Sequence, residues 1–154
     1  METRNDKTEL HNIHDLLVDS RKGYTEASQR AEDPQVKELL RSFAQERSGL
    51  ESEVHNELRK QDPSWDRGEG GTVKGDLHRA WMDIRDALSS TENANVLAEC
   101  ERGESFLLMR YDEVLKKEDL LGSTRILATG QRAQVQKNID RIKGLRKLFD
   151  KIEA

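Results

Sequence analysis

The sequence predicts an all-α fold: four long amphipathic helices in a bundle, with a short extra helix in the crossover between the second and the third. Charged residues make up 36% of the chain and hydrophobic residues 34%, a mixture typical of solvated helices with narrow buried stripes. Apolar residues recur at steps of three and four along four long segments. The two prolines stand where a helix is expected to begin or to have ended, so neither interrupts a predicted helix.

The first two helices are predicted over residues 6–31 and 34–61. Asp33 is the expected N-cap of the second helix, and Pro34 takes its first position, where a missing backbone N–H is tolerated. So short a turn predicts that the two helices lie side by side and antiparallel.

Residues 62–72 form a glycine-rich connector, which we expect to be the mobile segment of the chain. A short helix is predicted over residues 73–88, with its apolar residues on one side and no polar interruption. We expect it to lie against the outside of the bundle, with Trp81 as its anchor.

The last two long helices are predicted over residues 91–117 and 123–152, again joined by a short turn. Residues 89–91 supply the expected cap of the first of these helices, and Ser123 that of the second.

The long crossover determines the predicted order of the helices. A helix of about 28 residues is about 42 Å long, and the connector with its short helix is long enough to cover that distance. A hairpin would not need so long a connection. We therefore predict a single domain over residues 1–154, an up-down-down-up bundle in which the second and third long helices run in the same direction.

Each long apolar stripe is interrupted near its middle by polar residues. The register set by the two short turns brings these interruptions to one level of the bundle. A buried carboxylate costs several kcal/mol unless it is paired, so we expect Arg21 to bridge Glu46 and Glu104. The alternative is that some of these side chains point to solvent at the edge of the stripe. The expected buried polar layer comprises Arg21, Glu46, Glu101, Glu104, Gln134 and Asn138.

Interior glycines accompany these interruptions, and each costs roughly 1 kcal/mol relative to alanine in a helix. We expect them to mark close helix approach. They are Gly23, Gly49, Gly103, and Gly130 or Gly144.

Two motifs do not follow from helical periodicity: LHRAWMD at residues 77–83 and LAECERGE at residues 97–104. With the order of the helices and the Asp-Pro turn, they resemble a bacterial four-helix-bundle family of unknown function placed in the ferritin-like superfamily. The resemblance covers nearly the whole chain. It implies a ferritin-like bundle and a stress-related role.

Ferritin-like metal proteins take a carboxylate from each of two helices and a Glu-x-x-His motif from each of the other two. Glu46, Glu101 and Glu104 match carboxylates of such a site, but Gly49 stands where a histidine would follow Glu46. The fourth helix contains neither Glu nor His, and Arg21 stands where the first helix would need an acid. We therefore expect a degenerate metal site without a cofactor. The alternative is a di-metal carboxylate protein, an oxidoreductase or storage protein that binds iron or manganese through the three glutamates.

A second candidate metal site lies on the first two helices. His11 and His14 are one turn apart, and the register places them near Glu51 and His55. These spacings suit zinc or copper. The alternative is that they are surface histidines near helix ends.

Composition restricts the remaining classes of function. The lone Cys100 excludes an internal disulfide and fits a reducing compartment, and a net charge of −4 argues against general polyanion binding. We interpret the basic fourth helix as a solvated face, so nucleic acid is not an expected partner. No segment has the length and apolarity of a membrane span, and the polar start is unlike a signal peptide.

The sequence contains no Ser-His-Asp order, phosphate loop or zinc-finger spacing. We therefore expect a cytoplasmic, non-catalytic bundle that acts through protein contacts, either with a protein partner or as a homodimer.

Overall fold

The computed structural model describes residues 6–65, 76–89 and 92–153. All regular structure in these residues is α-helical. Where the structure describes both ends, the helix bounds lie within two residues of the predicted ones. The start of the predicted helix 73–88, residue 91 and most of the connector lie outside the described residues. The helices are α1 (Lys7–Arg30), α2 (Pro34–Gln61), α3 (Asp76–Leu88), α4 (Asn93–Leu115) and α5 (Gly122–Glu153).

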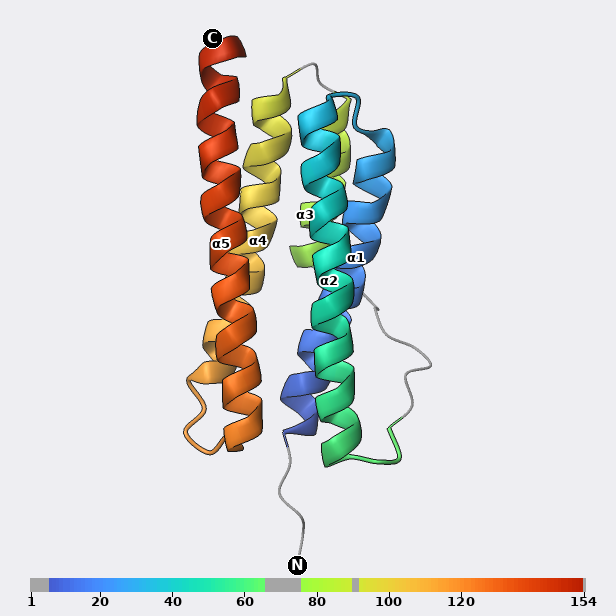
Figure 1. The fold of residues 1–154 in the computed structure, drawn as a ribbon, viewed down its shortest axis with the longest axis vertical. Coiled ribbons are helices and arrows are strands. Elements are labelled where there is room, and N and C mark those ends of the chain that lie inside the picture. Colours follow the sequence, from blue (N-terminus) through green and yellow to red (C-terminus); the bar gives the residue numbers. More distant parts are fainter. Residues whose placement is uncertain (1–5, 66–75, 90–91, 154) are drawn as a thin grey trace, which may run out of the picture.

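The four long helices form a bundle of two antiparallel pairs, α1 with α2 and α4 with α5 (Figure 1). Helices α2 and α4 run in the same direction, and α1 and α5 run in the opposite one. The short α3 lies between α2 and α4 in the chain and packs against α4 and α1. The predicted all-α bundle with one long crossover is therefore confirmed. No helix in the described ranges combines the length and apolar character needed to cross a membrane.

The α1–α2 turn has the predicted cap. One carboxylate oxygen of Asp33 accepts hydrogen bonds from the backbone N–H groups of Gln35 and Val36, at 2.9 and 3.1 Å. Pro34 follows as the first helical residue. The cap thus satisfies two of the N–H groups that the first turn of α2 leaves without helical partners.

The other two caps differ from prediction. Glu92 precedes α4 and makes no side-chain capping bond, while residues 90 and 91 lie outside the described residues. Ser123 lies inside the first turn of α5, and its hydroxyl donates to Glu57 at 3.1 Å. This bond joins α5 to α2 at the base of the bundle, where the expected cap would have served α5 alone.

The connector begins with an ordered contact that the glycine-rich composition did not predict. Trp65 is only 8% exposed and packs into the apolar core. Its backbone N–H donates to the Asp62 carbonyl at 3.0 Å, and its carbonyl accepts from Arg59 at 2.6 Å. The first residues of this segment are thus held against the bundle by Trp65, and residues 66–72 lie outside the described part of the chain.

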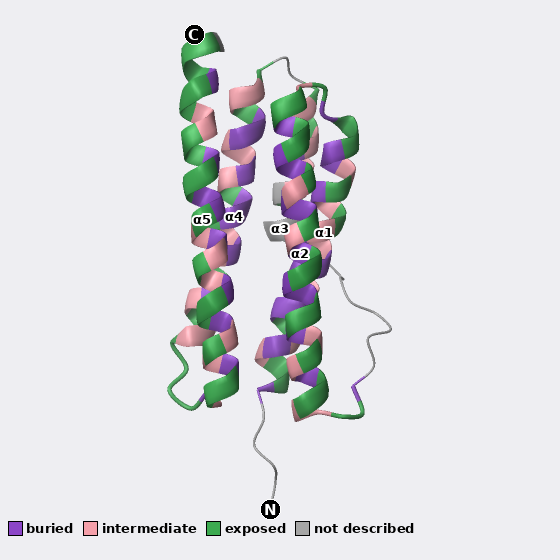
Figure 2. Cartoon of the chain, in the orientation of Figure 1, coloured by how far each residue is buried: buried purple, intermediate pink, exposed green. Residues whose placement is uncertain are grey.

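The apolar core consists of two clusters stacked along the bundle axis, and Figure 2 shows buried residues along all four long helices. One cluster contains Phe43, Leu97 and Cys100, and the other contains Leu17, Val54 and Leu107. The residues at the level between them on the long helices are polar. This division places the polar layer at the middle of the bundle.

The interior glycines do not share one function. Gly23 lies against the indole of Trp81, and an added Cβ would stand 3.3 Å from a ring carbon, which is a close helix approach. Trp81 therefore anchors α3 on α1, as predicted. Gly49, Gly130 and Gly144 have no neighbouring atom within 4 Å of where a Cβ would lie, so close approach does not explain them.

These two settings predict different effects of alanine. Gly49→Ala should raise the free energy of unfolding by about 0.5 to 1 kcal/mol, because alanine restricts the unfolded chain and meets no obstacle in the helix. Gly23→Ala should gain less, since its methyl group must displace Trp81. Urea unfolding followed by circular dichroism measures both changes. A larger gain for Gly23→Ala would contradict the close approach.

Candidate functional site

The centre of the bundle contains a completely buried guanidinium, that of Arg47 on α2. Its Nη2 donates to both carboxylate oxygens of Glu104. Its Nη1 donates to Glu46 at 2.9 Å, and its Nε donates to the hydroxyl of Ser20 at 2.9 Å. Each guanidinium nitrogen therefore has an acceptor, as a buried charge requires.

Glu104 on α4 receives donors from three other helices. Besides Arg47 on α2, the hydroxyl of Tyr24 on α1 donates to one carboxylate oxygen at 2.7 Å. The amide of Asn138 on α5 donates to the other oxygen at 3.2 Å. Glu104 is 1% exposed, so the contacts that stabilise its carboxylate come from the protein.

Glu46 lies at the edge of the layer, with 22% of its side chain exposed. It accepts from Gln134 at 3.0 Å and from Asn138 at 2.6 Å, in addition to Arg47. The layer thus joins the α1–α2 pair to the α4–α5 pair through side chains from all four long helices.

Burial and charge together determine the protonation states in this layer. Burial alone would lower the pKa of Arg47, but Glu104 and its other neighbours raise that pKa above its ordinary value, so the guanidinium stays charged. Burial and the adjacent Glu104 carboxylate raise the pKa of Tyr24, which keeps the phenol neutral and able to donate. Burial likewise raises the pKa of Cys100, so its thiol remains protonated.

The cation of the layer is Arg47, whereas the sequence predicted Arg21. Arg21 turns to the edge of the bundle and pairs with Glu51, with 2.6 Å between Nε and a carboxylate oxygen. The stripe of α2 identifies the correct residue, because Arg47 lies four residues after Phe43 and three before Leu50. Arg47 therefore continues the stripe of α2, whereas Glu46 lies beside it.

Glu101 also departs from the expected layer. It lies beside Arg146 of α5, with 3.5 Å between a carboxylate oxygen and Nη1. The structure therefore brings Glu46, Glu104, Gln134 and Asn138 together, and places Arg21 and Glu101 in separate ion pairs. Tyr24 and Ser20 join the layer without having been predicted.

A second polar link lies between the polar layer and the α4–α5 turn. The hydroxyl of Tyr111 on α4 donates to the Gln131 carbonyl oxygen at 2.6 Å. The Gln131 amide in turn donates to the Leu50 backbone carbonyl at 3.1 Å and to Glu53 at 3.2 Å. This chain connects α4, α5 and α2 a second time. Each of its residues is a single polar position within an otherwise regular apolar stripe, so the sequence pattern did not indicate this link.

The candidate histidine site is occupied by a tryptophan. The rings of His11, His14 and His55 lie around the indole of Trp65, at centroid distances of 6.3, 5.2 and 4.9 Å. Glu51, the expected fourth ligand, pairs with Arg21. The three imidazoles thus meet an aromatic ring where the sequence suggested an ion.

His14 is the most constrained of these histidines. It is 1% exposed, and neither ring nitrogen has a hydrogen-bond partner among the described residues. Burial lowers its pKa below the ordinary value of 6.5, against the opposing effect of Glu51 and Asp15. His14 is therefore held neutral in the folded chain.

This neutral histidine predicts a loss of stability in acid. Below about pH 6.5 His14 binds a proton in the unfolded chain more readily than in the folded chain, where its pKa is lowered. The free energy of unfolding therefore falls as the pH is lowered. The fall between about pH 8 and about pH 5 should be smaller in His14→Leu than in the unmodified chain. Urea unfolding at each pH measures this difference. Equal falls in the two proteins would contradict it.

The buried ion pair predicts a large effect of removing its cation. Arg47→Ala should lower the free energy of unfolding by about 3 kcal/mol or more, because it leaves the Glu104 carboxylate buried and uncompensated. Arg132→Ala removes an Arg–Asp pair whose partners are 36% and 42% exposed, and should cost less than about 1 kcal/mol. The double variant Arg47→Met with Glu104→Leu should recover much of the loss. Chemical denaturation of the four proteins measures these values, and equal losses for both arginines would contradict the buried pair.

The donor set of the polar layer does not fit a di-metal centre. Both oxygens of Glu104 accept from a guanidinium, and a phenol and an amide supply further donors. No imidazole takes part in these contacts. Within the described ranges, no group of three or more His, Cys, Asp or Glu side chains is placed to hold a metal ion.

The model of a family described as a domain of unknown function, DUF2383, matches residues 6–117, a span that includes α1 to α4. No curated protein and no solved structure matches the chain.

Proposed function

Because that match spans more than two thirds of the sequence, the chain belongs to the DUF2383 family, and we propose that it is a non-catalytic helical bundle acting through protein contacts. One observation carries this proposal: the Arg47 guanidinium occupies the centre of the polar layer and binds Glu46 and Glu104. The layer has an internal cation of its own and is a structural element.

The order of the long helices supports placement in the ferritin-like superfamily. In ferritin-like metal proteins, inward carboxylates at mid-bundle bind metal ions. Here Glu46 and Glu104 are inward carboxylates at mid-bundle, but their partners are a guanidinium, amides and a phenol. We interpret the layer as a degenerate metal site in a bacterial, cytoplasmic protein. The family resemblance alone suggests the stress-related role.

The layer would fix the register of the two helix pairs. A shift of one helix by a turn would separate Arg47 from Glu104 and leave two buried charges uncompensated. Apolar stripes alone tolerate such shifts more readily, because one leucine can replace another in a contact. A rigid bundle of defined register is suited to presenting a constant surface to a partner.

Metal content tests this proposal against an iron- or manganese-binding carboxylate protein. The purified full-length chain, from cells supplied with both metals, should contain far less than one metal ion per chain by inductively coupled plasma mass spectrometry. Glu46→Ala and Glu104→Ala should leave that amount unchanged, as should the matched control Glu113→Ala, because Glu113 lies on α4 like Glu104 but is 49% exposed. Stoichiometric metal that is lost in either layer variant and retained in the control would overturn the proposal. Glu46 is partly exposed, so its variant keeps the test valid if Glu104→Ala does not fold.

A further inference from the structure

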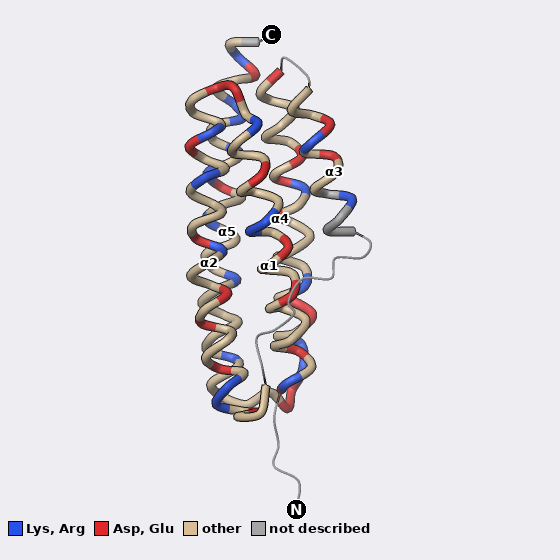
Figure 3. Tube along the Cα trace, turned by 90° about the vertical axis from the view of Figure 1, so that its right-hand side faces the viewer, with Lys and Arg blue, Asp and Glu red and all other residues tan. Residues whose placement is uncertain are grey.

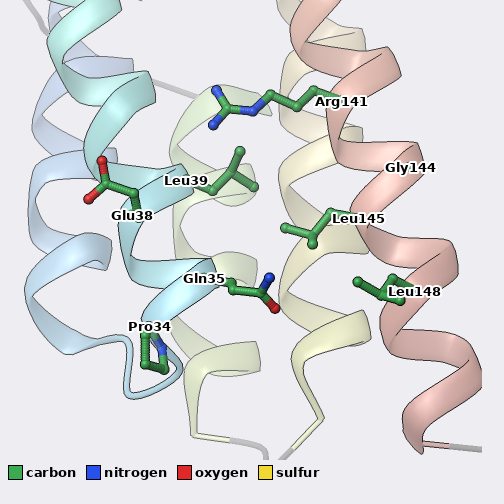
Figure 4. Close-up of a pocket in the computed structure, with 8 residues that line it drawn as sticks. All are labelled: Pro34, Gln35, Glu38, Leu39, Arg141, Gly144, Leu145 and Leu148. Carbon is green, nitrogen blue, oxygen red and sulfur yellow. The ribbon is translucent and has the colours of Figure 1, made fainter.

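A groove of about 570 Å³ runs between the beginning of α2 and the C-terminal half of α5 (Figure 4). The side chains of Leu39, Leu145 and Leu148 lie between the two helices, and Arg141 extends from α5 toward α2. The remaining lining residues of the groove are Pro34, Gln35, Glu38 and Gly144.

An exposed apolar ridge on α5 continues this groove. Leu145, Leu148 and Ile152 follow at steps of three and four residues, so they share one face of the helix. Leu148 is 45% exposed and Ile152 is 67% exposed. The end of α5 extends beyond the α1–α2 turn (Figure 1), so it leaves the cover of the bundle. Exposed apolar side chains gathered in this way mark a contact surface.

The two walls of the groove carry opposite charges. Glu38 is exposed on α2, and Arg141 is exposed on α5. Figure 3 shows acidic and basic residues along the bundle, and α5 as a whole is basic, with eight Lys or Arg against three Asp or Glu. At the groove itself, the charged lining residues are one acid on α2 and one base on α5. A second copy of the chain offers an acid for each base and a base for each acid.

We propose that a second copy of this chain docks on the groove, with a two-fold axis parallel to the helices. This inference rests on the proposed function through protein contacts and assigns its surface and its partner. In that arrangement α5 of each copy lies beside α2 of the other, because a two-fold axis makes every contact reciprocal. Leu145 and Leu148 of both copies then form a shared apolar core over Leu39, which is only 2% exposed at the base of the groove, and Arg141 of each copy faces Glu38 of the other. Gly144 presents no side chain and has open space beside it, which allows close approach of the second copy.

Sedimentation velocity over a dilution series tests the apolar part of this interface. The full chain should sediment at high concentration with twice its mass of 17.7 kDa. Leu148→Gln with Ile152→Gln should raise the dissociation constant about tenfold or more, since each change removes apolar area from the contact. Ile126→Gln is the matched control, because Ile126 is 77% exposed at the other end of α5 and should leave dimerisation unchanged. A monomer at all concentrations, or equal effects of the two sets of variants, would overturn the proposal.

A charge exchange tests the reciprocal pairing. Glu38→Arg and Arg141→Glu should each weaken the dimer, because each places like charges in contact across the axis, and the double variant should restore it. Arg141 also donates to Ser42 at 3.2 Å, so Ser42→Ala separates the loss of this internal bond from the loss of charge. A double variant that dissociates as readily as the single ones would exclude this geometry. A metal-free monomer would reject the dimer while leaving the proposed non-catalytic function in place.

Discussion

The ion pair between Arg47 and Glu104 is the interaction on which the rest of the bundle depends. Both side chains are almost completely buried, and transferring two such charges from water costs several kcal/mol each before they attract one another. That cost is offset only when every donor and acceptor is satisfied, which here requires side chains from all four long helices. The pair therefore ties the conformation of each helix to that of the other three.

The layer also explains why the apolar core is divided. Apolar contacts within each antiparallel pair are extensive, and they hold α1 to α2 and α4 to α5. Between the pairs, the hydrogen bonds of Glu46 and Glu104 add direction to the apolar contacts, as do those of Gln131 and Ser123 nearer the α4–α5 turn. Directional contacts distinguish one register from its neighbours, while the two apolar clusters supply most of the favourable free energy of burial.

The sequence predicts the helices and the level of the layer well, and the direction of its side chains less well. Apolar steps of three and four define the long helices, and the short turns define which residues are level. Adjacent helical residues point about 100° apart, so Glu46 and Arg47 lie at one level but face different neighbours. Register alone could not choose between Arg21 and Arg47 as the cation. The packing of Trp65 among three histidines depends on the path of a connector, for which sequence periodicity carries no information.

A guanidinium at the centre of the bundle has a consequence for where function can reside. An inorganic ion can be exchanged, can change its oxidation state and can open a coordination position, whereas a covalently attached guanidinium can do none of these. The proposed function through protein contacts rests on the outer faces of the bundle. Helix α5 links these faces to the layer, because Gln134 and Asn138 bind the layer while Leu148 and Ile152 remain exposed near its end. The buried layer fixes the position of α5, and that position determines what surface the bundle presents.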